Sequence, residues 1–254
     1  MKRVIAGLGA MLLLASPALG QVKTSEIMIK SGDEEIKAFL AQPEGKGPFP
    51  AVVVIQEWWG LNDWIKDNAK RIAGKGYVAI APDIYRGKVT DNPKVASTLI
   101  KGLPKERGLQ DLKAAVTYIS AMPNVQKDRI GSIGWCMGGG YSLDLALADA
   151  RIHACVMCYG RVITDSAALK SLKGPVLGIF GEEDKGIPAK GVREFEAALK
   201  QAGKTVEKIS IYPGAGHGFM RAMNGSQSNP EYREAAAKDA WMQIDAFFAK
   251  TLTK

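Results

Sequence analysis

Short apolar runs alternate with longer segments of helical periodicity along most of the chain. Residues 106–122 carry leucine, valine and isoleucine on one helical stripe, and the segment from about Pro230 onward repeats such a stripe toward the C-terminus. The apolar runs, several of them rich in β-branched residues, predict strands covered on both faces, as in a parallel sheet. They lie at residues 51–55, 77–81, 130–135, 153–157, 176–180 and 208–212.

This alternation predicts an α/β fold, with an open, mostly parallel, doubly wound sheet flanked by helices. Residues 26–30 and 35–41 have the pattern of an antiparallel hairpin at one edge of the sheet. Residues 87–105 form the most polar insertion and are interpreted as a surface helix and loops. Because no repeat or linker divides the chain, we expect a single domain over residues 21–254.

The first twenty residues have the three-part pattern of a secretory signal peptide. A basic start at residues 2–3 precedes an uncharged, mostly apolar run at residues 4–14, and the small residues Ala18 and Gly20 stand just before a cut ahead of Gln21. The apolar run is shorter than the roughly 20 residues that a membrane-spanning helix needs. We therefore expect a periplasmic or secreted protein without a stable membrane anchor after cleavage.

Composition narrows the class of protein. The chain has 254 residues, of which 46% are hydrophobic and 24% charged, and its formal net charge is +8. These values exclude a disordered chain, a collagen-like fibre and a small disulfide-stapled scaffold. Lysine and arginine are spread thinly, without the basic cluster that marks a nucleic-acid-binding surface. A globular, enzyme-sized body remains, as a monomer or a small homo-oligomer.

Two of the three cysteines are predicted to be core thiols. Cys155 and Cys158 fall on one predicted strand, where residues three apart lie about 10 Å from each other and point to opposite faces. That separation is beyond the reach of a disulfide. The chain has only two histidines, with no spacing suited to zinc, so we expect neither a metal nor an organic cofactor.

Residues that can carry chemistry stand directly after the apolar runs. In open α/β sheets, ligands bind beyond the carboxyl ends of the strands, so we expect these residues at one edge of the sheet. They are Gln56, Glu57, Trp58, Trp59, Asp83, Tyr85, Arg86, Cys136, Tyr159, Glu182, Glu183, Asp184 and His217.

The segment Gly134–Gly140 has the pattern of a nucleophile elbow, with Cys136 in place of the usual serine. The glycines leave room for a strained turn between a strand and a helix. The turn also places the sulfur at a helix N-terminus, where the partial positive charge stabilises a thiolate. A buried cysteine beside a tight glycine turn is the alternative interpretation.

A cysteine nucleophile needs a base, and His217 is the candidate. It lies in a flexible glycine turn after a predicted strand, whereas His153 lies at the start of a strand and is interpreted as structural. Asp184 follows the preceding strand and would orient the imidazole, with Glu182 and Glu183 as competitors for that role. The order Cys136, Asp184, His217 is that of nucleophile, acid and histidine in α/β-hydrolases.

Six short motifs in this order make the sequence similar to the dienelactone hydrolase family, from about Lys37 to the C-terminal helix. They are Gln56-Glu57-Trp58-Trp59-Gly60, Ala81-Pro82-Asp83-Ile84-Tyr85, Gly134-Trp135-Cys136-Met137-Gly138-Gly139, Tyr159-Gly160, Gly181-Glu182-Glu183-Asp184 and His217-Gly218-Phe219. The resemblance implies an α/β-hydrolase fold and a carboxylic ester hydrolase of the carboxymethylenebutenolidase type. It also implies a triad of Cys136, His217 and Asp184.

The resemblance further implies roles for residues around the triad. Glu57 is expected to touch the resting thiol and to help activate it when substrate arrives. The backbone N–H groups of Met137 and Trp58 are expected to form the oxyanion hole. Arg221 and Arg86 are expected to bind a substrate carboxylate, although Arg86 stands one residue earlier than in the family pattern Asp-Leu-Tyr-Ala-Arg. Tyr85 and Trp59 complete the expected substrate-binding set.

The sequence therefore favours a secreted hydrolase that cleaves a lactone or a small activated ester, including an anionic one, through a thioacyl-enzyme. Two alternatives stay open. One is a carboxylesterase or thioesterase of broad specificity. The other is a periplasmic binding protein that uses the same fold without catalysis.

Overall fold

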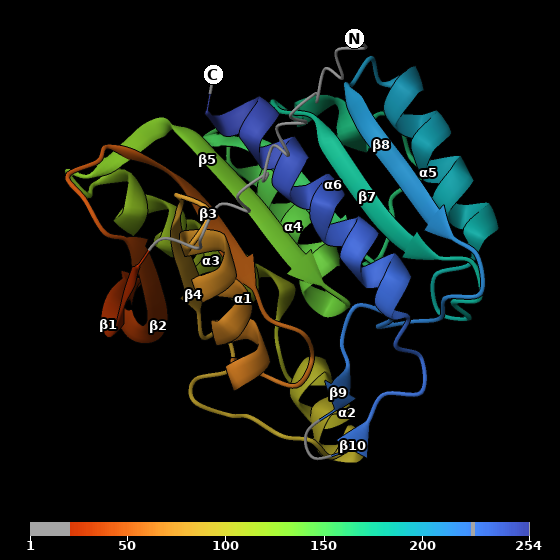
Figure 1. The fold of residues 1–254 in the computed structure, drawn as a ribbon, viewed down its shortest axis with the longest axis horizontal. Helices are drawn as coiled ribbons and strands as arrows, with labels where there is room; N and C mark the ends of the chain where they lie inside the picture. The colour runs from red at the N-terminus through yellow and green to blue at the C-terminus, as the bar shows by residue number, and fades with distance from the viewer. Residues whose placement is uncertain (1–20, 225–226, 254) are drawn as a thin grey trace, which may run out of the picture.

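The computed structural model describes residues 21–224 and 227–253, and the predicted leader at residues 1–20 lies outside them. Eight strands form one sheet in the order β1-β2-β4-β3-β5-β6-β7-β8 (Figure 1). Strands β3 to β8 pair in parallel, which confirms the predicted mostly parallel sheet. The strands are β1 (Val22–Ser31), β2 (Glu34–Pro43), β3 (Phe49–Ile55), β4 (Val78–Pro82), β5 (Val125–Trp135), β6 (Ile152–Cys158), β7 (Val176–Gly181) and β8 (Val206–Tyr212).

The central strands are apolar because both of their faces are covered. All five residues of β4 and all six of β7 are buried. The antiparallel hairpin predicted at one edge is β1 and β2, and β2 also pairs in antiparallel fashion with β4. The hairpin therefore closes one edge of an otherwise parallel sheet.

Helices cover the sheet on two sides (Figure 1). One hydrophobic core gathers residues of α1 and α6, such as Ile65 and Ile244. A second core contains residues of α3, α4 and α5, such as Leu112, Leu143 and Val192. The helices are α1 (Asp63–Ala73), α2 (Pro93–Lys101), α3 (Lys105–Ser120), α4 (Met137–Ala148), α5 (Ala189–Gln201) and α6 (Glu234–Leu252), with a 3₁₀ turn at Ala168–Ser171.

The polar insertion at residues 87–105 contains a surface helix, as predicted. The side chain of Asn92 accepts hydrogen bonds from the N–H groups of Lys94 and Val95 at the start of α2, and Pro93 occupies the first turn. Ala96 is the one fully buried residue of this helix. The insertion contributes only Leu103 to the core that contains α3, α4 and α5, with Leu99 packed against that core.

The last helix begins later than predicted. A start near Pro230 is wrong, because α6 begins at Glu234. The side chain of Asn229 accepts from the N–H of Glu231 and donates to the carbonyl oxygens of Gly218 and Arg221. These bonds tie the chain before α6 to the preceding loop, together with the two short strands β9 (Met223–Asn224) and β10 (Gln227–Ser228).

The cysteine predictions are confirmed. All three cysteines are free thiols, and both Cys155 and Cys158 are buried on β6. Cys155 belongs to the core that contains α3, α4 and α5, whereas Cys158 belongs to the core that contains α1 and α6. The two side chains therefore lie on opposite faces of the sheet.

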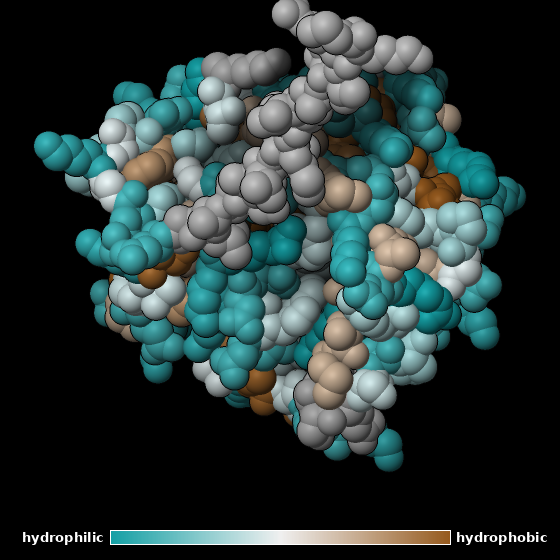
Figure 2. All heavy atoms as spheres, in the orientation of Figure 1, coloured by the Kyte–Doolittle hydropathy of each residue, from teal (hydrophilic) through white to brown (hydrophobic). Residues whose placement is uncertain are grey.

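The face shown in Figure 2 is mostly hydrophilic, with brown atoms confined to small separate areas. Over residues 21–224 and 227–253, no helix combines the length and the apolar character needed to cross a bilayer.

Candidate active site

A pocket of about 520 Å³ opens at the carboxyl ends of the parallel strands. It brings together residues that lie far apart in the sequence, as the position of each after a strand predicts. The predicted site residues that line it are Glu57, Trp58, Trp59, Cys136, Asp184, His217 and Arg221. A second cavity of about 530 Å³ adjoins it and shares the side chain of Arg221.

Cys136 sits in a strained turn between β5 and α4. Its backbone has φ of 56° and ψ of −119°, a left-handed conformation that is costly for a residue with a Cβ. The neighbouring positions must be glycine because other backbone atoms lie too close for a side chain. A Cβ at Gly134 would collide with the carbonyl oxygen of Gly138, and a Cβ at Gly138 would collide with the carbonyl oxygen of Ile55. This geometry matches the predicted nucleophile elbow, and it leaves the thiol partly exposed at the N-terminus of α4.

His217 reaches the same pocket from the loop after β8, and its partner is Asp184. The Nδ1–H of His217 donates to Oδ2 of Asp184 at 2.7 Å. The other carboxylate oxygen of Asp184 accepts from the N–H groups of Gly186 and Ile187 at 2.8 and 2.9 Å. Because three donors hold a side chain that is only 1% exposed, Asp184 orients the imidazole. The competing acids Glu182 and Glu183 are exposed.

The surroundings of this pair shift the pKa of both groups. Burial raises the pKa of Asp184, but the hydrogen bond from His217 and the two backbone donors outweigh it, so the pKa lies below its ordinary value. Burial lowers the pKa of His217, but hydrogen bonds with Asp184 and with Cys136 raise it to about 10. The imidazole therefore carries a proton at neutral pH and is held by the carboxylate of Asp184.

Glu57 and Arg221 form a buried ion pair on another wall of the pocket. Nη1 of Arg221 donates to Oε2 of Glu57 at 2.5 Å, and the two side chains are 6% and 4% exposed. The guanidinium also lies over the rings of Trp59 and Trp64, at 5.9 and 5.4 Å from their centroids. Burial raises the pKa of Glu57, and the charge of Arg221 opposes that rise.

This ion pair gives Glu57 a partner that the sequence did not predict, and the expected contact of Glu57 with the resting thiol stays a prediction. Among the described residues, the carboxylate of Glu57 hydrogen-bonds to Arg221 and not to Cys136. A carboxylate this deeply buried needs a charged partner, and Arg221 supplies it. The guanidinium expected to meet a substrate carboxylate is thus already bound to a carboxylate of the protein.

The two N–H groups expected in the oxyanion hole have no acceptor among the residues that the structure describes. The N–H groups of Met137 and Trp58 donate to no backbone or side-chain oxygen there. Trp58 lines the pocket, and Met137 follows Cys136 at the first position of α4, where an N–H has no partner within the helix. Both N–H groups are therefore without a protein acceptor in the described residues, although only Trp58 is among the residues that line the pocket.

Arg86 and Tyr85 are not among the residues that line this pocket. The guanidinium of Arg86 pairs instead with Asp111 and Glu34, at 3.0 and 2.7 Å, so the expectation that Arg86 binds a substrate carboxylate is at odds with its placement. The hydroxyl of Tyr85 donates to the sulfur of Met137 at 3.3 Å. Burial, with Tyr141 and Cys136 nearby, raises the pKa of Tyr85, so the phenol keeps its proton at neutral pH.

Sequence reasoning missed several residues of the pocket. Asn229, Lys185 and Glu231 line it, and Asn229 fixes the loop that carries His217. Tyr159, which the sequence placed after a strand and in a family motif but gave no role, has a φ of 38° and places its buried ring edge-on to the imidazole of His217, 5.2 Å between centroids. Its position after β6 was a usable signal, whereas no local pattern marks Asn229.

Asp184→Asn should lower the pKa of His217, because a neutral amide replaces the charged acceptor. The folded-state pKa of about 10 exceeds the ordinary 6.5. Protonation of His217 therefore contributes stability that is fully present below pH 6.5 and is lost as the pH rises toward 10. An NMR titration of the imidazole measures the shift, and His153→Gln assigns the signals because the chain has two histidines. An unchanged titration of His217 in the variant would contradict this account.

Comparison with known proteins agrees with this geometry. The model of the dienelactone hydrolase family matches residues 36–252. A Methylorubrum extorquens protein named "Putative carboxymethylenebutenolidase" is 34% identical over 249 residues, which cover 92% of this chain and 83% of that protein. A Synechocystis protein of the same name is 32% identical and covers 91% and 98%.

The fold has relatives of known structure. A crystal structure from Klebsiella pneumoniae, titled as that of a "Putative Dienelactone Hydrolase", is 30% identical, with a TM-score of 0.81 over 91% of this chain and 100% of that one. The expected α/β-hydrolase fold and family resemblance are both confirmed. The chain belongs to the dienelactone hydrolase family and is a hydrolase of that type.

Proposed function

We propose that this chain hydrolyses a lactone or a small carboxylic ester through Cys136, His217 and Asp184, with a thioacyl-enzyme as intermediate. One observation carries the proposal. The thiol stands at a left-handed turn ahead of α4, in the same pocket as the hydrogen-bonded His217 and Asp184. The presence of a thiol, an imidazole and an orienting carboxylate in one pocket supports nucleophilic catalysis by Cys136.

The first half of the reaction forms the thioacyl-enzyme. In the proposed reaction Cys136 attacks as the thiolate, from the N-terminus of α4. The thiolate attacks the carbonyl carbon, and the negative charge passes to the carbonyl oxygen, which the N–H groups of Met137 and Trp58 receive. The C–O bond to the alcohol then breaks, and His217 gives its proton to the departing alkoxide. In a lactone that alkoxide stays attached to the acyl chain.

The second half regenerates the thiolate of Cys136 and the protonated form of His217. His217, now neutral, takes a proton from water as the water oxygen attacks the thioester carbon. The same two N–H groups receive the second oxyanion, and the C–S bond breaks to release a carboxylic acid. Asp184 stays ionised and holds the imidazole in one orientation through both halves, because its own pKa is depressed.

Glu57 is proposed to couple substrate entry to activation of the thiol. Its carboxylate lines the pocket beside Cys136 but is held by Arg221. An anionic group that enters the pocket competes with Glu57 for this guanidinium. A carboxylate released in this way keeps a raised pKa because it is buried, which suits it to accept a proton from the thiol.

A carboxylesterase of broader specificity is the second candidate. The observation that favours it is the engagement of Arg86 by Asp111 and Glu34, which leaves Arg221 alone to recognise a carboxylate. A pocket with one such group discriminates less between charged and neutral esters than a pocket with two.

Export is also part of the proposal. A cut before Gln21 leaves the whole sheet intact, because β1 begins at Val22. Intact mass of the protein recovered from the periplasm or medium tests it: the mass should correspond to residues 21–254. Recovery of the uncut chain from the cytosol alone would refute export.

Cys136→Ala should lower kcat for p-nitrophenyl acetate by about 10⁴-fold or more, since no other thiol can replace the nucleophile. Cys155→Ala is the matched control, because Cys155 is 1% exposed and lies in the core. Iodoacetamide should modify Cys136 and abolish activity in parallel, which mass spectrometry and the ester assay measure together. Turnover that survives Cys136→Ala would refute the triad.

Glu57→Gln should change the pH dependence of Cys136 alkylation, because it removes an ionisable group that shares the pocket with the thiol. The rate of iodoacetamide incorporation between pH 5 and 10 measures the change. The exposed acid Glu183, which lines the same pocket, provides the control as Glu183→Gln. Identical profiles for wild type and Glu57→Gln would reduce Glu57 to a structural partner of Arg221.

A further inference from the structure

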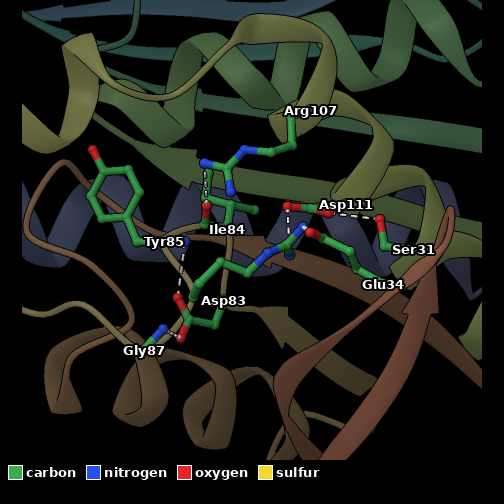
Figure 3. A network of polar contacts seen from close by, with 9 residues as sticks. Ser31, Glu34, Asp83, Ile84, Tyr85, Gly87, Arg107 and Asp111 are labelled. Atoms are coloured by element: carbon green, nitrogen blue, oxygen red, sulfur yellow. Dashed lines mark hydrogen bonds and ion pairs between the residues drawn. The ribbon is translucent and has the colours of Figure 1, made fainter.

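The turn between β4 and α2, at residues 83–87, is held by polar contacts on several sides (Figure 3). The carboxylate of Asp83 accepts hydrogen bonds from the backbone N–H groups of Tyr85 and Gly87. Arg107 of α3 donates to the carbonyl oxygen of Ile84. Arg86 itself has a left-handed backbone, with φ of 56°. A non-glycine residue keeps this conformation only where its surroundings impose it.

The side chain of Arg86 joins three separate parts of the fold. Its two terminal nitrogens contact Asp111 on α3 at 3.0 Å and Glu34 at the start of β2 at 2.7 Å. Asp111 is 1% exposed and also accepts a hydrogen bond from Ser31 of β1 at 2.6 Å. The edge hairpin, α3 and the 83–87 turn are therefore tied together at one buried carboxylate.

The side chain of Tyr85, the residue before Arg86, leaves the turn in another direction. In Figure 3, Tyr85 points away from Asp111 and Glu34. Its ring is buried, 4% exposed, and its hydroxyl donates to the sulfur of Met137 at 3.3 Å. Met137 follows the nucleophile directly and supplies one of the two N–H groups proposed for the oxyanion hole. The turn thus connects the Arg86–Asp111 pair to the first residue of α4.

We infer that Arg86 is a positioning residue and not a substrate-binding one: its ion pair with Asp111 holds the 83–87 turn so that Tyr85 is fixed against Met137, beside Cys136. The inference rests on the proposed function, since it assigns a task to Tyr85 in the same reaction. Groups that hold an oxyanion must be placed accurately, and displacements of about 1 Å can lower rates by up to about 10²-fold.

The alternative role would require Arg86 to leave this pair. Asp111 would then keep a buried charge without a cation, since its remaining partner is the neutral hydroxyl of Ser31. Breaking a buried pair on one side is far less favourable than leaving it intact. Arg86 also lies outside the lining of the pocket, unlike Arg221, so an anionic substrate that enters there meets Arg221 and leaves the pair of Arg86 with Asp111 intact.

A double-mutant cycle tests whether Arg86 acts through Tyr85. We expect Arg86→Ala and Tyr85→Phe each to lower kcat by about 10-fold, with KM nearly constant, for p-nitrophenyl acetate and for p-nitrophenyl hemisuccinate alike. The double variant should be no slower than the slower single variant, because both changes remove one linkage. Arg86→Lys should restore part of kcat, since a lysine reaches one of the two acids but not both.

Arg151→Ala is the matched control. Arg151 also pairs with a mostly buried aspartate, Asp149, at 2.6 Å, but at the opposite end of α4 from Cys136. It should lower the Tm, as Arg86→Ala does, and leave kcat unchanged. If Arg86→Ala does not fold, the cycle is run with Arg86→Lys.

Three outcomes would overturn the inference. A rise in KM confined to the hemisuccinate would make Arg86 a substrate-binding residue. Additive losses in kcat would separate it from Tyr85, and a lower Tm with unchanged kcat would make it purely structural. Failure of the proposed function gives a different result. In that case ester hydrolysis would survive Cys136→Ala or treatment with iodoacetamide, in a chain that keeps Arg86 and Tyr85.

Discussion

The left-handed backbone at Cys136 is the constraint on which the rest of the site depends. It lets β5 end and α4 begin within one residue, which leaves the sulfur at the N-terminus of the helix. The turn persists because its surroundings fix it: the N–H of Cys136 donates to the carbonyl oxygen of Cys158 at 3.0 Å, and the neighbouring glycines pack against the backbone of β3 and β6. Every other group of the pocket has to meet the sulfur where this turn places it.

Ion pairs and charged hydrogen bonds bring those other groups to the turn. Asp184 orients His217, Arg221 holds Glu57, and a third pair, Arg86 with Asp111, lies just outside the pocket. In each case a mostly buried carboxylate fixes a cationic group that comes from a different segment of the chain. Buried ion pairs add little net stability against hydrophobic replacements. They do give fixed directions to charges, which is what a site that stabilises a developing oxyanion requires.

Much of this arrangement could be predicted from the sequence, because two features that determine it can be recognised without knowing which side chains are in contact. The elbow is a contiguous motif, and the carboxyl ends of parallel strands must meet at one edge, so Cys136, Asp184 and His217 were expected together. The partners of Arg221 and Arg86 were not predictable in this way. Glu57 lies 164 residues from Arg221, and nothing in either segment encodes their contact. The start of α6 was misplaced for the same reason, since the side chain of Asn229 bonds to a loop that sequence periodicity does not describe.

The carboxyl edge of the sheet brings the residues that follow the strands close together. The backbone φ angles in the turns then set the direction in which each of their side chains points. Tyr85 and Arg86 are adjacent in the sequence, yet one reaches Met137 and the other reaches Asp111, with a left-handed residue at the point where they diverge. A shift of one residue in a family motif therefore does more than move an arginine by one position. Here the guanidinium pairs with Asp111 and Glu34 and lies outside the lining of the pocket. On the inference drawn above, substrate preference in this pocket depends on the geometry of the 83–87 turn as well as on the presence of arginine in the motif.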